Sequence, residues 1–226
     1  KQENNIVVLS SIQGTSDLLA EATKYYYNRN AEGAIEILNS LEKEYRQLIA
    51  ELLSDAKIVE IALGYLVDSI SYLQGFSEEM FTLFEERALM AQGELMSSTL
   101  FSLILKEKGL QVHVLPALDF MRMDRNEAPD SLYIKENLQK VLSESPQNCI
   151  YLTQGYICRN VFGEVDDLRK GGSDYTAAII GAAVKAEEIQ IWADMDVMLN
   201  INPKYVKNAR IIDRLNFDEA AELAYF

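Results

Sequence analysis

The segment with the clearest chemical potential is Gly171-Gly172-Ser173-Asp174, which opens an Ala-rich amphipathic stretch at residues 173–186. Two glycines let the backbone turn tightly and approach a ligand closely. The N–H groups in the first turn of a helix have no partner inside the helix, so an anion is favoured there. Lys170 adds a positive charge just before the glycines. The segment indicates a phosphate site, or else an ordinary loop in which Ser173 or Asp174 caps the helix.

A second group of polar residues follows the apolar run 189–192, which is predicted to be a strand. Asp194 and Asp196 stand at its carboxyl end, where carboxylates could hold Mg²⁺ or accept hydrogen bonds from a ribose. The alternative for this pair is a solvated turn. Lys204 lies further on, in the turn-like sequence Asn202-Pro203-Lys204, and adds a nearby cation.

Gly93 and Glu94 lie inside a strongly helical stretch. A glycine there costs about 1 kcal/mol relative to alanine, so we expect another backbone or a ligand to approach closely. Glu94 could bind an ammonium group, and the alternative is a surface carboxylate. Ser16 offers a hydroxyl near the expected start of the first helix, for which Ser16 or Asp17 is the predicted N-cap.

The bulk composition limits the possible partners. The chain has 226 residues, 49% of them hydrophobic, and a formal net charge of −14, which predicts a sizeable core and repulsion from nucleic acid and anionic membranes. No apolar run of about 18 residues predicts a membrane span. Cys149 and Cys158 lack metal-site spacing and are expected to be free thiols of a cytoplasmic protein. The single histidine, His113, gives no support to a histidine-based metal site or triad.

Strands and helices alternate in the second half of the sequence. Strands are predicted at 6–9, 112–115, 150–152 and 189–192, a hairpin at 156–168, and helices over most of 17–108 and at 130–145, 173–186 and 217–226. Breaks in the long helical region are predicted at 28–30 and 74–77, with a new helix starting at 77–79 and closing at Gly109. This alternation predicts a mainly parallel sheet covered on both faces, with ligands beyond the carboxyl ends of its strands.

Taken in order, these segments resemble the aspartate kinase branch of the amino-acid kinase family. The matching segments are residues 7–10 with Gly14, 92–97, 153–157, 171–177, 191–194 and 218–224. The resemblance covers essentially the whole chain. It implies a three-layer α/β/α sandwich with a mainly parallel central sheet and a large helical insert, so that residues 1–226 would form one catalytic domain.

The resemblance also implies a reaction. The γ-phosphoryl group of ATP, with Mg²⁺, would pass to the side-chain carboxylate of L-aspartate and give 4-phospho-L-aspartate, the first step towards lysine, threonine and methionine. A carboxylate nucleophile is already ionised at pH 7, so the reaction needs positioning and charge cancellation rather than a general base. A homodimer is the expected assembly.

Site residues follow from the resemblance position by position. The expected substrate-binding residues are Ser16, Glu94, Lys170, Ser173 and Asp174, of which Lys170 and Asp174 are also expected to act in catalysis. The expected nucleotide-binding residues are Gly171, Gly172, Asp194 and Lys204, and no protein ligand to a metal is expected.

Several positions depart from the family pattern. Lys170 stands where arginine is usual, Val197 where glycine is usual, and Asn202 where aspartate is usual. The usual first strand with its lysine, the segment that normally follows Phe226 and the ACT domains are not in the sequence. We therefore expect a domain cut at both ends that is inactive by itself. The alternatives are a degenerate kinase domain with a regulatory or oligomerisation role, and another amino-acid kinase.

Overall fold

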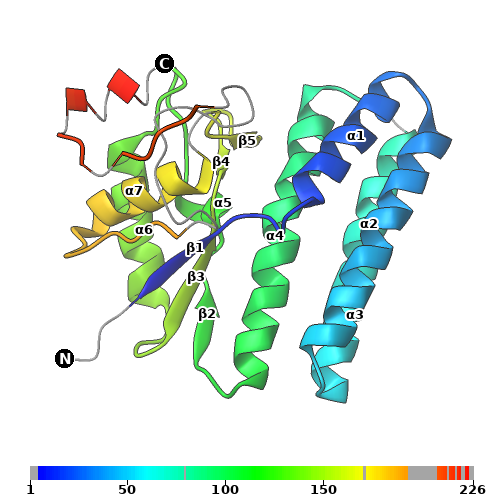
Figure 1. The fold of residues 1–226 in the computed structure, drawn as a ribbon, viewed down its shortest axis with the longest axis horizontal. Coiled ribbons are helices and arrows are strands. Elements are labelled where there is room, and N and C mark those ends of the chain that lie inside the picture. The colour runs from blue at the N-terminus through cyan, green and yellow to red at the C-terminus, as the bar shows by residue number, and fades with distance from the viewer. Residues whose placement is uncertain are drawn as a thin grey trace. The chain divides into compact units, whose positions relative to one another are not determined.

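The computed structural model describes residues 5–78, 80–169 and 172–192 and, beyond them, 208–212, 214–216, 218–219 and 222–223. The chain divides into two compact units, Lys1–Ile189 and Gln190–Phe226. The elements labelled in Figure 1 all belong to the first unit.

A parallel sheet of three strands lies at the centre of the first unit. Its strands are β1 (Ile6–Leu9), β2 (Val112–Val114) and β3 (Ile150–Gln154), in the spatial order β1-β3-β2. The register places Ile6 opposite Tyr151 and Val8 opposite Thr153. Short, nearly continuous apolar runs form such strands because both faces of a parallel sheet are covered. The prediction of a parallel sheet is confirmed.

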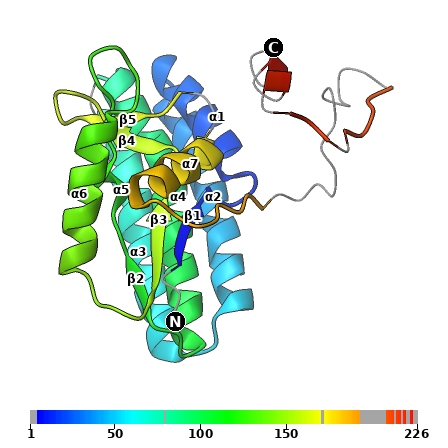
Figure 2. The same cartoon turned by 90° about the vertical axis from the view of Figure 1, so that its left-hand side faces the viewer.

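Helices cover both faces of this sheet, as Figures 1 and 2 show. One face packs against α4 (Leu83–Glu107), and the other is covered by α7 (Gly172–Val184) with α6 (Ser131–Glu144) beside it. The short helix α5 (Ala117–Phe120) and the antiparallel hairpin of β4 (Ile157–Arg159) and β5 (Val165–Asp167) lie near the end of the sheet. The predicted three-layer arrangement and the predicted hairpin are therefore confirmed.

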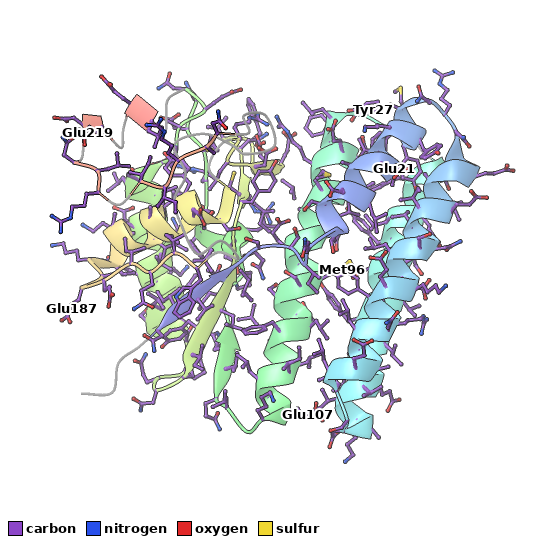
Figure 3. All side chains as sticks on the ribbon, viewed as in Figure 1. Glu21, Tyr27, Met96, Glu107, Glu187 and Glu219 are labelled. Atoms are coloured by element: carbon purple, nitrogen blue, oxygen red, sulfur yellow. The ribbon has the colours of Figure 1, made fainter. Side chains whose placement is uncertain are left out.

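The large helical insert packs on the far side of α4 from the sheet (Figure 1). It consists of α1 (Thr15–Tyr27), α2 (Ala31–Leu52), α3 (Ala56–Gly75) and a 3₁₀ turn at Phe76–Glu78. These helices form one hydrophobic core and the sheet forms another, and α4 contributes to both. Met96, for example, projects from α4 towards the insert (Figure 3).

Contrary to the expectation from the sequence, the long helix α4 is apolar enough, by length and composition alone, to span a membrane. Its most apolar window has a mean hydropathy of 1.3, and 56% of that window is buried inside the unit. Residues of α4 belong to both hydrophobic cores, so the helix packs against other elements on two sides. This packing accounts for its apolar composition.

Two predicted helix boundaries are wrong, and one boundary was not predicted. At the predicted start, residues 77–78 belong to the 3₁₀ turn instead, and α4 begins after Thr82, which makes a capping box with Glu85. A break at 53–55 was not predicted, although Asp55 accepts hydrogen bonds from the first N–H groups of α3. The first helix begins at Thr15 with Gly14 as its N-cap, at φ 88°, so neither Ser16 nor Asp17 is the cap.

The capping box at Thr82 gives a stability prediction. Thr82→Ala should lower the free energy of unfolding by about 1 kcal/mol, because the Thr82 hydroxyl accepts the Phe84 N–H and also binds the Glu85 carboxylate. Urea denaturation measures this. Ser40→Ala, which removes an exposed hydroxyl in the interior of α2, is the control and should be close to neutral. Equal effects of the two substitutions would contradict the role of Thr82 as a cap.

The strand predicted at 189–192 is wrong. These residues have no regular secondary structure, and no described strand pairs with them. A short apolar run becomes a strand only when a neighbouring strand satisfies its backbone groups. Ile189 packs against Gly181 of α7 instead, and the Trp192 side chain is 87% exposed.

In the second unit, the helix predicted at 217–226 is confirmed for its described residues, 218–219 and 222–223. Asn216 and Glu219 exchange hydrogen bonds between side chain and backbone N–H at 2.8 and 2.9 Å, which is a reciprocal cap.

Candidate active site

Ser10 joins three elements at the carboxyl end of the sheet. Its hydroxyl donates to the Ser173 hydroxyl at 2.7 Å, and its carbonyl oxygen accepts the Ser97 hydroxyl at 2.7 Å. Ser10 follows β1, Ser173 lies in the first turn of α7, and Ser97 lies in the middle of α4. These contacts bring α4 and the start of α7 to the same loop.

Ser16 lies in the first turn of α1 and faces the same loop. Its hydroxyl oxygen is 2.6 Å from that of Ser11. A Cβ added to Gly93 would lie 3.1 Å from Ser11 Cβ and 3.5 Å from Thr15 Cγ2. The close approach predicted at Gly93 is therefore present: the start of α1 and the loop before it pack against Gly93.

Glu94 is a buried carboxylate beside this contact. It is 6% exposed, so the surface alternative for Glu94 is wrong. Burial raises the pKa of Glu94 to about 7, while hydrogen bonds with its own backbone and with that of Ser11 act in the opposite direction. Among the described residues no cation forms a salt bridge with it. A buried carboxylate without a cationic partner is costly when ionised, and a bound ammonium group would offset that cost.

The end of β3 fixes the position of α7. A Cβ added to Gly155 would lie 2.2 Å from Ser173 Oγ and 2.7 Å from Ser173 Cα, so only glycine fits between β3 and α7. The Tyr156 N–H donates to Thr176 Oγ1 at 2.9 Å, with Tyr156 in the left-handed region at φ 64°. The amino-terminal end of α7 is thus held directly beyond the carboxyl ends of the strands.

The first turn of α7 begins at Gly172, which has φ 50°. Ser173 and Asp174 therefore lie inside the first turn, and the alternative in which one of them caps the helix from outside is wrong. Asp174 is exposed. The free N–H groups of this 13-residue helix suit an anion, as the glycine pair predicted.

Gln154 is the last residue of β3 and had no predicted role. Its side chain accepts the Ala117 N–H at 2.9 Å and donates to Ser98 Oγ at 2.8 Å, and it is buried. Ser10 and Ser97 lie in the matching segments 7–10 and 92–97 but had no predicted role, and neither had Ser98. The segment 153–157 was recognised as part of a motif, but the partners of Gln154 are distant in sequence.

Of the expected site residues, the structure brings Ser16, Glu94, Gly172, Ser173 and Asp174 into the region where β1, β3, α4 and α7 meet. Lys170, Gly171, Asp194 and Lys204 lie outside the described residues, and their roles stay predictions. Within the described part of the chain, no three His, Cys, Asp or Glu side chains cluster as a metal site.

The sequence matches the amino acid kinase family over residues 1–226, so the chain belongs to this family. The similar curated proteins and solved structures are mainly aspartokinases. Lysine-sensitive aspartokinase 3 of Escherichia coli is 36% identical over 141 residues, which cover 61% of this chain and 31% of that protein. The aspartokinase of Chlamydia muridarum is 29% identical over 230 residues, which cover 99% of this chain and 49% of that protein.

Two structures of E. coli aspartokinase III are similar to this chain. The complex with aspartate and ADP, in the R-state, has a TM-score of 0.83 at 28% identity and covers 98% of this chain and 49% of that one. The T-state complex with lysine and aspartate has a TM-score of 0.77. The chain spans between a quarter and a half of the length of the curated relatives it matches.

Proposed function

We propose that this chain belongs to an aspartate kinase, which phosphorylates the side-chain carboxylate of L-aspartate with ATP. The observation that carries the proposal is Glu94, a buried carboxylate without a cationic partner among the described residues, placed beside the hydroxyls of Ser11 and Ser16. Such a carboxylate suits the α-ammonium group of an amino acid. The similarity to an aspartokinase that binds aspartate and ADP, over 98% of this chain, supports this substrate pair.

In the proposed mechanism, residues of three helices contact different groups of the substrate. Glu94 on α4 holds the α-ammonium group, while the Ser16 hydroxyl on α1 and the Ser173 hydroxyl on α7 orient the carboxylates. The side-chain carboxylate of aspartate attacks the γ-phosphorus, and the bond from that phosphorus to the leaving ADP oxygen breaks. Since the attacking carboxylate is already ionised, the protein has to position it and to cancel negative charge.

The residues present fit a nucleotide phosphate at the start of α7. Gly172 leaves room for close approach, and the free N–H groups of the first turn would bind the phosphate oxygens; we propose that Gly171 also contacts the nucleotide. We propose that Lys170 neutralises charge there and that Asp174, Asp194 and Lys204 complete the site. Mg²⁺ supplies further charge neutralisation and would arrive with the nucleotide, so no protein ligand is assigned to it.

The proposal is tested by aspartate-dependent release of ADP. The assay uses a protein in which the family's usual first strand, with its lysine, precedes this chain. Turnover with L-aspartate, and little with L-glutamate, is the expected result. A protein with that lysine intact and no aspartate-dependent turnover would contradict the proposal.

A degenerate kinase domain is the second candidate, and the substitutions at Lys170, Val197 and Asn202 favour it. Calorimetric titration with Mg-ATP separates the two candidates. Tight binding is expected of a working kinase, whereas a degenerate domain with a regulatory or oligomerisation role need not bind the nucleotide.

A further inference from the structure

Three serines form a connected chain of hydrogen bonds across the candidate site. The Ser97 hydroxyl on α4 donates to the Ser10 carbonyl oxygen at 2.7 Å, and the Ser10 hydroxyl donates to the Ser173 hydroxyl oxygen on α7, also at 2.7 Å. The loop that contains Ser10 runs from β1 past α4 to α1 (Figure 1). The chain of hydrogen bonds therefore connects α4 with the first turn of α7 through this loop.

The direction of these bonds leaves one O–H group available at the end of the chain. A serine hydroxyl has one hydrogen to donate and two lone pairs that accept. The Ser173 oxygen accepts from Ser10, and among the described residues the Ser173 hydroxyl donates to no acceptor. Its O–H therefore suits an anionic oxygen of a ligand, because hydrogen bonds to ionised acceptors are the strong ones.

Ser97 differs from the other buried serines of α4 in the partner of its hydroxyl. Ser98 and Ser102 donate to carbonyl oxygens of their own helix, at 3.1 and 2.8 Å, as serines inside helices commonly do. The Ser97 hydroxyl reaches Ser10, 87 residues away in the sequence, and its contact with the Glu94 carbonyl oxygen is longer, at 3.3 Å. The shorter bond of Ser97 thus fixes a different element of the fold.

Glu94 and Ser97 lie side by side on α4. Residues three apart in a helix are neighbours on its surface. In the proposed function, Glu94 holds the ammonium group of aspartate, and the first turn of α7 lies at the nucleotide phosphate. One side of α4 therefore carries both the residue that holds the amino acid and the residue that fixes the loop leading to Ser173.

We propose that Ser97 is a positioning residue for phosphoryl transfer, which acts through Ser10 to fix the Ser173 hydroxyl relative to Glu94. This inference rests on the proposed function. Transfer requires the reacting atoms to be held about 3–3.5 Å apart and aligned, and a misplacement of about 1 Å can cost roughly a hundredfold in rate. In this role Ser97 touches neither reactant and sets the spacing between residues that do.

The test is Ser97→Ala in the protein in which the family's usual first strand, with its lysine, precedes this chain. We expect kcat to fall about tenfold, while the KM values for aspartate and ATP each change by less than about twofold. Each substrate keeps the residues that bind it, and only the alignment of the two is lost. Alanine is the best helix former and removes one hydroxyl, so the variant should fold, and urea denaturation checks this.

Ser102→Ala is the matched control. It removes a buried hydroxyl from the same helix, but one that donates only to the Thr99 carbonyl oxygen of that helix. It should leave kcat and both KM values unchanged.

A double variant tests whether Ser97 acts through Ser10. Ser10→Ala removes the next hydrogen bond of the chain, the one to Ser173. If both residues act through this chain, kcat of the double variant should equal that of the more impaired single variant, because the second substitution removes nothing further.

A parent protein without aspartate-dependent turnover would contradict the proposed function itself, whereas the results that overturn this inference all require an active parent. They are a Ser97→Ala variant with kcat within about twofold of the parent, a loss confined to the KM for aspartate, an equal loss in Ser102→Ala, and independent losses in the double variant.

Discussion

Glu94→Gln is expected to raise the KM for aspartate by about ten- to a hundredfold and, at the same time, to stabilise the fold at alkaline pH. The kinetic effect follows from the proposed function, because a charge-assisted hydrogen bond to the substrate ammonium would be lost. The stability effect follows from burial alone. Steady-state kinetics and urea denaturation between pH 4 and pH 8.5 measure the two effects.

The sign of the pH effect is set by the raised pKa of Glu94, about 7 in the folded protein against 4.5 for an ordinary glutamate. A folded state that binds the proton more tightly gains stability that is fully present below pH 4.5 and is lost as the pH rises through 7. The loss is on the order of 3 kcal/mol. Glu94→Gln lacks an ionisable group there, so its stability should exceed that of the parent most clearly at pH 8.5.

Glu107→Gln is a control of opposite sign. Hydrogen bonds from the Ser54 side chain and from the backbone N–H groups of Ser54 and Asp55 lower the pKa of Glu107. Ionised Glu107 therefore favours the folded state at neutral pH, and its removal should reduce stability there. A parent protein whose stability does not fall between pH 5 and pH 8.5 relative to Glu94→Gln would show that Glu94 is not the buried group described.

Gly155→Ala should be the most disruptive single substitution in the candidate site. The new Cβ would lie 2.2 Å from Ser173 Oγ and 2.7 Å from the Ser173 Cα atom. A rotamer change of Ser173 relieves the first contact but not the second, so α7 would have to move away from β3. We expect a loss of about 3 kcal/mol or more in the free energy of unfolding, together with loss of aspartate turnover.

Gly64→Ala is the matched control for Gly155→Ala. Gly64 lies inside α3, and a Cβ there meets nothing within 4 Å. Alanine should therefore stabilise the helix by roughly 0.5–1 kcal/mol. If Gly155→Ala unfolds at the same urea concentration as the parent, the close packing of β3 against α7 is not needed for the fold.

Much of the sheet and its coverage could be predicted from the sequence because local patterns determine them. The apolar run at 6–9 predicts a buried strand, and the pattern at 156–168 predicts the hairpin, which turns at Gly163 with φ 84°. The close approach at Gly93 could also be predicted, because glycine is costly inside a helix unless something needs the space.

Other features could not be predicted, for physical reasons. Residues 77–79 and Thr82 both offer helix-start signals, and tertiary packing rather than the local sequence selects Thr82. The contacts of Ser10 with Ser97 and Ser173 join residues that are distant in the chain, so no local pattern reveals them. The burial of Glu94 depends on α1 crossing Gly93, which is again a tertiary effect. Residues 189–192 look like a strand, but no described strand pairs with them.

The pairing of β1 with β3 also constrains how the chain can fold as it is synthesised. β1 leaves the ribosome well before its partner residues, 151–154, which are made only after α1–α4 and α6. The helices of the insert contact their neighbours in sequence and form a core without the sheet, so they can assemble early. β1 must therefore wait for β3 while the insert folds, and the candidate site, which needs the loop after β1 and the start of α7, is completed after the insert.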